Sequence, residues 1–186
     1  MTATALDIPG YKAGTWVLDP SHSEVTFSVR HMMISKVRGT FGVKSATMTA
    51  PENPLETTVT ASVDVASVNT GDEGRDNHLR SADFFDAETY PTIDFRSSGV
   101  RVENDRMLVD GELTIRDVTK PVTFEVDFGG FGTDPWGNYK AGATATAVID
   151  REQFGLTWNA ALETGGVLVG KDVTMVLDLQ GALQES

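Results

Sequence analysis

Apolar residues recur at every second position along most of this chain, between short segments rich in turn residues. In one such stretch, Val25, Phe27 and Val29 alternate with Thr26 and Ser28. A period of two places neighbouring side chains on opposite faces of a β-strand, so each strand has one apolar face. The same alternation predicts strands at 16–18, 24–30, 37–43, 58–65, 92–96, 111–116, 122–128, 139–150 and 173–179. Helical periodicity is nearly absent, and the pattern indicates an all-β chain.

Eight or nine antiparallel strands joined by short turns form either a sandwich or a closed barrel, because both arrangements deal with exposed strand edges. An eight-stranded barrel has an interior that either fills with side chains or holds one small ligand. In the run GATATAVID, Ala143, Ala145 and Ala147 face inward if Ile149 does. These small side chains favour a ligand, while packing of a helix or a large aromatic side chain against them is the alternative.

One helical insertion is predicted between two strands, near residues 71–86. Its opening run TGDE gives Thr70 and Glu73 the spacing of a capping box, in which each side chain bonds the backbone amide of the other. Asp76 and Arg80 are four residues apart and can pair across one turn. We expect this insertion to cover one mouth of a barrel.

Composition limits the class of protein. A chain of 186 residues with 40% hydrophobic residues suits one domain, which we divide into a flexible N-terminal lead at 1–13 and a single barrel domain at 14–182. The net charge of −12 opposes binding to nucleic acid or to anionic headgroups. The chain has no cysteine, so it has neither disulfides nor thiolate chemistry.

The first residues, MTATALDIPGYKAGTW, show neither the basic start nor the apolar run of a signal peptide. Nowhere does the sequence approach the ~20 apolar residues that a membrane-spanning helix needs. We therefore expect a cytoplasmic protein without stable membrane insertion.

Candidate chemistry is sparse. His22, His31 and His78 equal in number the ligands of a three-histidine zinc site, but none has a partner at the local spacing that such sites use. The sequence also lacks a Gly-x-Ser-x-Gly elbow and a phosphate-binding loop, and FGGFG at 128–132, followed by TDPWGN, predicts a turn. No catalytic or metal-binding residue is predicted, and an enzyme or metal site built on the three histidines is the alternative.

Four runs of sequence resemble the YceI-like family. They are SVNTGDEGRDNHLRSADFFDAETYPTIDFRSS, GELTIRDVTKPVTFEV, HMMISKVRGTF and IDREQFGL, and they follow the family's order across residues 15–181. The resemblance implies an eight-stranded antiparallel lipocalin-like barrel around an elongated apolar cavity. It further implies non-catalytic binding, transport or storage of a polyisoprenoid or isoprenoid quinone, with that lipid as ligand and no other cofactor. A homodimer is a possible assembly.

Strand parity and this resemblance together predict the ligand-binding residues. Side chains expected to face the cavity are those of Phe27, Val29, Phe41, Val63, Phe95, Ile115, Phe124, Ala145 and Met175. His31 is expected at the mouth, near the lipid's head, and the residues expected to cover an end are Phe84, Phe85, Trp158 and Leu162. An ordinary filled core would place most of the same residues inward.

Overall fold

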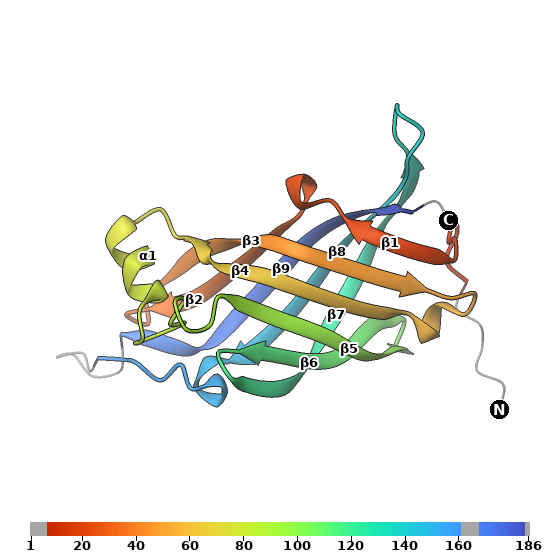
Figure 1. Cartoon of the computed structure of the whole chain (residues 1–186). Helices are drawn as coiled ribbons and strands as arrows, with labels where there is room; N and C mark the ends of the chain where they lie inside the picture. Colours follow the sequence, from red (N-terminus) through yellow and green to blue (C-terminus); the bar gives the residue numbers. More distant parts are fainter. Residues whose placement is uncertain (1–6, 161–167, 185–186) are drawn as a thin grey trace.

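The structure, a computed structural model, describes residues 7–160 and 168–184 as an elongated antiparallel barrel (Figure 1). Its strands are β1 (Gly14–Leu18), β2 (Glu24–His31), β3 (Ser35–Ala50), β4 (Thr58–Asn69), β5 (Thr92–Glu103), β6 (Arg106–Ile115), β7 (Val118–Thr133), β8 (Tyr139–Asp150) and β9 (Val169–Leu183). The helical elements are α1 (Glu73–Arg80) and the 3-10 turns η1 (Pro20–His22), η2 (Pro54–Glu56) and η3 (Arg151–Phe154). Every predicted strand is present, and most are longer than the alternation alone indicated.

The sheet closes on itself. Strands β2 to β9 form a ring in the order β3-β2-β9-β8-β7-β6-β5-β4, and pairing of β3 with β4 completes it. The ninth strand, β1, pairs with both β3 and β9 and so continues the position of β2 beyond η1. Closure leaves each barrel strand hydrogen-bonded on both sides, which removes the edges of an open sheet. The predicted eight-stranded antiparallel barrel with a helical insertion is confirmed, with one extra strand.

Two glycines allow large rings to pack inside the barrel. A Cβ atom on Gly39 would lie 2.4 Å from the ring of Phe27, and one on Gly111 would lie 2.5 Å from the ring of Phe95 and from the carbonyl oxygen of Arg96. Both distances are too short for any side chain. The strands therefore carry glycine where an inward aromatic ring crosses the neighbouring backbone.

An aromatic cluster fills the end of the barrel opposite α1. Trp16 is buried, and its ring lies 5.9 Å from the rings of Phe131 and Tyr139. The Tyr139 hydroxyl donates to the Gly10 carbonyl at 2.5 Å, so part of the segment predicted as a flexible lead contacts the barrel. The division into 1–13 and 14–182 stays a prediction.

The turn predicted over FGGFG and the following TDPWGN is present in its second part only, because β7 continues through FGGFG to Thr133. A break in register between Phe128 and Gly130, where Gly130 has φ +118°, absorbs the irregularity within the strand. The chain turns instead at 134–138, where Asp134 accepts hydrogen bonds from the backbone of Trp136 and Asn138. Asx-type bonding of this kind stabilises the reversal at the DPWGN part of the predicted turn.

Candidate functional site

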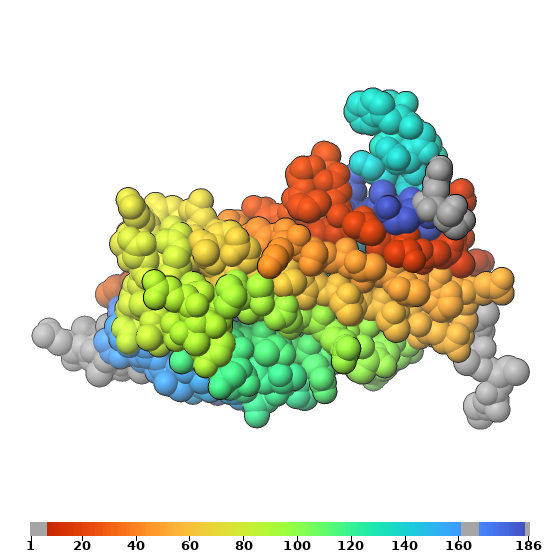
Figure 2. Space-filling model, in the orientation of Figure 1, coloured from red at the N-terminus to blue at the C-terminus, as the bar shows by residue number. Residues whose placement is uncertain are grey.

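The barrel interior is hollow at the end covered by α1. The cavity measures about 220 Å³, and 23 of the described residues line it, of which eighteen are apolar. The apolar residues are Val25, Phe27, Val29, Val37, Phe41, Val63, Leu79, Phe84, Phe85, Ile93, Ile115, Ile149, Leu156, Trp158, Leu168, Val169, Val173 and Met175. The other five are Arg30, His31, Arg75, His78 and Arg151. Figure 2 shows α1 and the loop after it spread over this end of the molecule.

Most of the residues predicted to contact a ligand line this cavity. They are Phe27, Val29, His31, Phe41, Val63, Phe84, Phe85, Ile115, Trp158 and Met175. Three others do not line it, namely Phe95, Phe124 and Ala145. Leu162 lies outside the described residues. Ligand contact by any of these residues stays a prediction.

The three residues away from the cavity face inward, as parity predicted, but lie where the interior is filled. The rings of Phe95 and Phe124 meet edge to face with their centroids 5.1 Å apart. Ala145 is buried in the same apolar cluster as Phe124. The cavity therefore occupies one part of the barrel, and Ala143, Ala145 and Ala147 are not among its described lining residues.

Helix α1 starts later than the sequence pattern indicated. Its N-cap is Asp72, whose carboxylate accepts from the Arg75 amide at 3.0 Å, as is typical of an aspartate at this position. The predicted capping box is wrong, because Thr70 precedes the cap and instead donates its hydroxyl and its amide to the buried carboxylate of Asp76. Arg75 in turn donates to the Thr70 hydroxyl and carbonyl, which fixes its side chain against the cavity.

Arg80 connects the helix to β4 rather than to Asp76, so the predicted pair between these two residues is wrong. Its guanidinium donates to the carbonyls of Ala66 and Val68, at the end of β4. The carboxylate of Asp76 instead accepts hydrogen bonds from Thr70. At eight residues, α1 is too short to cross a membrane, and within the described ranges no helix is long and apolar enough to do so.

Three aromatic side chains connect α1 with the segment after η3. The His78 ring meets Trp158 edge to face at 4.6 Å and Phe84 at 5.1 Å, and Phe84 lies 5.4 Å from Trp158. His78 Nε2 lies 2.9 Å from a carboxylate oxygen of Asp83, which orients the ring. Together these contacts close one side of the cavity with rings rather than with backbone.

Arg151 organises the neighbouring part of the cavity lining from a buried position. The residue is 4% exposed, and its guanidinium donates to the carbonyls of Leu156, Trp158, Val169 and Gly170 at 2.6–3.2 Å. Burial lowers the pKa of Arg151. These bonds hold the segment after η3 against the start of β9, and both segments line the cavity.

The structure separates the three histidines. His31 and His78 line the cavity, whereas His22 lies on η1, outside it, where its Nδ1 is 2.7 Å from an oxygen of Asp19. Hydrogen bonds from Ser21 and from His22 hold the pKa of Asp19 well below its usual range. No group of three or more His, Cys, Asp or Glu that could hold a metal ion is present among the residues described. The alternative of one cavity site using all three histidines is wrong.

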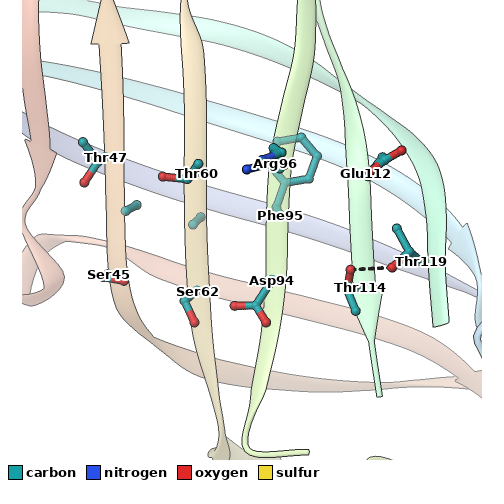
Figure 3. Close-up of a pocket in the computed structure, with 12 residues that line it drawn as sticks. Ser45, Thr47, Thr60, Ser62, Asp94, Phe95, Arg96, Glu112, Thr114 and Thr119 are labelled. Atoms are coloured by element: carbon teal, nitrogen blue, oxygen red, sulfur yellow. Dashed lines mark hydrogen bonds between the residues drawn. The ribbon is translucent and has the colours of Figure 1, made fainter. Parts of the chain in front are cut away.

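A second hollow, of about 400 Å³, lies on the outer face of strands β3 to β6 (Figure 3). Its polar side chains occupy ordinary outward positions, as with Arg96, which is paired in register with Glu112. Thr114 and Thr119 share a 2.8 Å hydrogen bond across its edge. The hollow is larger than the inner cavity, but it is open and polar and lies on the side of the sheet away from the buried core.

Sequence reasoning missed the cationic part of the lining. Arg75, His78 and Arg151 line the cavity, but none of them is among the residues predicted to contact a ligand. All three lie in runs that carry the family resemblance, Arg75 and His78 in GRDNHL and Arg151 in IDREQFGL. That was the available signal, since strand parity says nothing about residues in a helix or a turn.

A closed antiparallel barrel with one helix over an apolar cavity places this chain in the class of small barrels that can enclose a ligand. The model of the YceI-like domain matches residues 16–181. The chain therefore belongs to the YceI-like family, and the resemblance found in the sequence is confirmed.

Relatives agree with this assignment. A UPF0312 protein of Staphylococcus aureus is 38% identical over 172 residues, which cover 91% of this chain and 98% of the relative. The crystal structure of BcnA from Burkholderia cenocepacia has a TM-score of 0.74 at 24% identity and covers 88% of this chain and 98% of its own. A polyisoprenoid binding domain from Saccharophagus degradans, implicated in plant cell wall breakdown, has a TM-score of 0.67 at 14% identity and covers 91% and 98%. Both likenesses concern the fold.

Proposed function

We propose that this protein binds an isoprenoid-type lipid, a polyisoprenoid or an isoprenoid quinone, in the cavity under α1 and carries or stores it without catalysing a reaction. The observation that carries the proposal is the cavity itself, an apolar space inside a closed barrel in which the polar side chains of the described lining are all Arg or His. The similarity of the fold to a protein described as a polyisoprenoid binding domain supports the choice of ligand class.

Burial of hydrocarbon supplies the affinity. Each buried methylene contributes ~0.8 kcal/mol, so one five-carbon isoprene unit contributes on the order of 4 kcal/mol before ordering costs. The cavity volume of about 220 Å³ is below the ~300–1,000 Å³ typical of ligand pockets. We infer that it holds a few isoprene units, and that a longer chain extends through the mouth or displaces side chains.

The polar lining suits a headgroup that accepts hydrogen bonds. Arg75, Arg151, His31 and His78 can donate, and no carboxylate is among the described lining residues. A quinone carbonyl, an alcohol oxygen or a phosphate would find donors here, whereas a cationic head would not. The same part of the lining contains no Ser, Thr or Cys that could act as a nucleophile beside His78, which supports binding rather than catalysis.

Native mass spectrometry of gently purified protein tests the proposal. We expect a bound mass in the range of isoprenoid lipids, and we expect Val63→Trp, which fills the cavity, to lose it. Val148→Trp is the matched control, because Val148 is exposed on the outside of β8. Equal lipid content in the folded Val63 variant would place the lipid elsewhere, and one equivalent of metal without lipid would overturn the proposal.

A further inference from the structure

The turn between β2 and β3 presents three apolar side chains to solvent beside the cavity. Met32, Met33 and Ile34 are 44%, 60% and 82% exposed. The turn is attached to the cavity rim, because the Met32 amide donates to the Leu168 carbonyl at 2.7 Å and the Ile34 amide to the His31 carbonyl at 3.3 Å. Leu168 and His31 both line the cavity. The apolar tip, Met32–Ile34, therefore lies at the opening of the candidate site.

The backbone of this tip is unusual for the residues it carries. Met32 and Met33 have φ values of +54° and +62°. These are the two central residues of the β-turn His31–Ile34, and Asn-Gly is the preferred sequence for a β-turn with positive φ at both central positions. Two methionines here neither suit the backbone nor bury their side chains. Folding alone does not explain them, and backbone strain of this kind is typical of functional surfaces.

Cations surround the tip. Arg30, Lys36, Arg38 and Lys171 are all exposed on the strands that adjoin it. Arg30 and Lys36 are directly opposed in the β2–β3 register, an arrangement in which like charges repel. None of the four forms an ion pair with a carboxylate in the part of the chain that the structure describes. A chain with a net charge of −12 thus gathers unpaired positive charge around its apolar tip.

We propose that this surface, the apolar tip with its four cations, docks the barrel reversibly on an anionic phospholipid membrane, with the cavity mouth toward the lipid. Apolar side chains that enter the acyl boundary and cations that remain at the headgroups form the usual combination of a peripheral membrane site. The net charge of the whole chain does not prevent docking, since at physiological salt charges beyond ~8 Å are largely screened.

Docking at the mouth gives the proposed function a route for its ligand. An isoprenoid tail could then pass from the bilayer into the cavity without crossing water. Transfer through water would expose the methylenes of the tail, at a cost in free energy. Transfer of a lipid through the mouth rests on the proposed function, whereas docking on the membrane does not. A variant whose cavity is filled, Val63→Trp, should still bind membranes.

Flotation with vesicles tests the proposal on the full chain. We expect binding to vesicles of phosphatidylcholine mixed with phosphatidylglycerol, much weaker binding to phosphatidylcholine alone, and a loss of binding at high salt. The double substitution Lys36→Gln and Arg38→Gln should weaken binding on the order of 25-fold, at about fivefold for each cation. Equal binding to both kinds of vesicle would overturn the electrostatic part of the proposal.

The tip itself is tested by Met32→Asn with Met33→Gly, which removes the apolar side chains while suiting the turn. We expect this variant to fold at least as stably as the wild type and to lose vesicle binding. Trp136→Ser is the matched control, because Trp136 is 83% exposed on the β7–β8 turn, away from α1 (Figure 1), and it should bind normally.

Two outcomes would overturn the assignment of this surface to a membrane. One is unchanged vesicle binding by the Asn-Gly variant. The other is a dimer, seen by light scattering without vesicles, that the Asn-Gly variant no longer forms, because the tip would then pack against a second copy of this chain.

Discussion

Replacement of the buried Arg151 tests how the rim of the cavity is held together. Arg151→Met keeps an unbranched apolar stem but removes a guanidinium that donates four hydrogen bonds to backbone carbonyls. Hydrogen bonds to charged groups contribute about 1.5–3 kcal/mol each, and release of the charge from a buried position offsets part of their loss. We expect the free energy of unfolding to fall by about 3–5 kcal/mol, the range for disruption of a buried charged network.

Urea and thermal unfolding measure this change. For a chain of this length the expected loss corresponds to a melting temperature lower by roughly 6–20 °C. Arg151→Lys, which keeps the charge but cannot reach four carbonyls, should lose about half as much. Arg106→Met is the control, because Arg106 is exposed and its ion pair with Glu125 is 3.6 Å long, so its loss should change stability by less than about 0.5 kcal/mol. An Arg151→Met protein within about 1 kcal/mol of the wild type would refute the reasoning.

Three further substitutions test single features of the structure through their effect on stability. Gly39→Ala should destabilise the barrel by about 1–3 kcal/mol and reduce its ligand content, because the new methyl group would push the Phe27 ring toward the cavity. An unchanged melting temperature would contradict this prediction. Met33→Gly should raise the free energy of unfolding by about 1 kcal/mol, since glycine accepts the positive φ, and urea titration checks it. The hydrogen bond from Arg101 lowers the pKa of Asp110 in the folded protein. The stability that this carboxylate contributes is therefore fully present above about pH 4, the pKa of an unfolded aspartate. It is lost as the pH falls through the lower pKa of the folded state. The difference in melting temperature between wild type and Asp110→Asn should therefore shrink below that pH, and a constant difference would argue against the pair.

Local sequence determined the strands and their inward faces. Alternation at Phe27, Phe41 and Phe124 gives the direction of each side chain, because a strand has only two faces and water excludes apolar groups from one. The positions of turns and helix caps were less evident from the sequence. At the Asx turn of Asp134 and the helix cap of Asp72, several nearby polar side chains could have accepted the hydrogen bonds of the backbone amides. The predicted cap was two residues too early for that reason, and the predicted turn included five residues that belong to β7.

Only the tertiary structure decided where the barrel is hollow. Parity is the same for Phe27, which lines the cavity, and for Phe95, which lies in the filled part, because position inside a barrel depends on closure and register rather than on period. Arg75 and Arg151 reach the same cavity from segments 76 residues apart in the chain, and no local pattern brings them together. The sequence by itself determined an antiparallel β-chain with apolar inner faces and, through its resemblance, a family. The cavity, its cations and the exposed apolar tip beside it arise from long-range pairing, which no short stretch of residues contains.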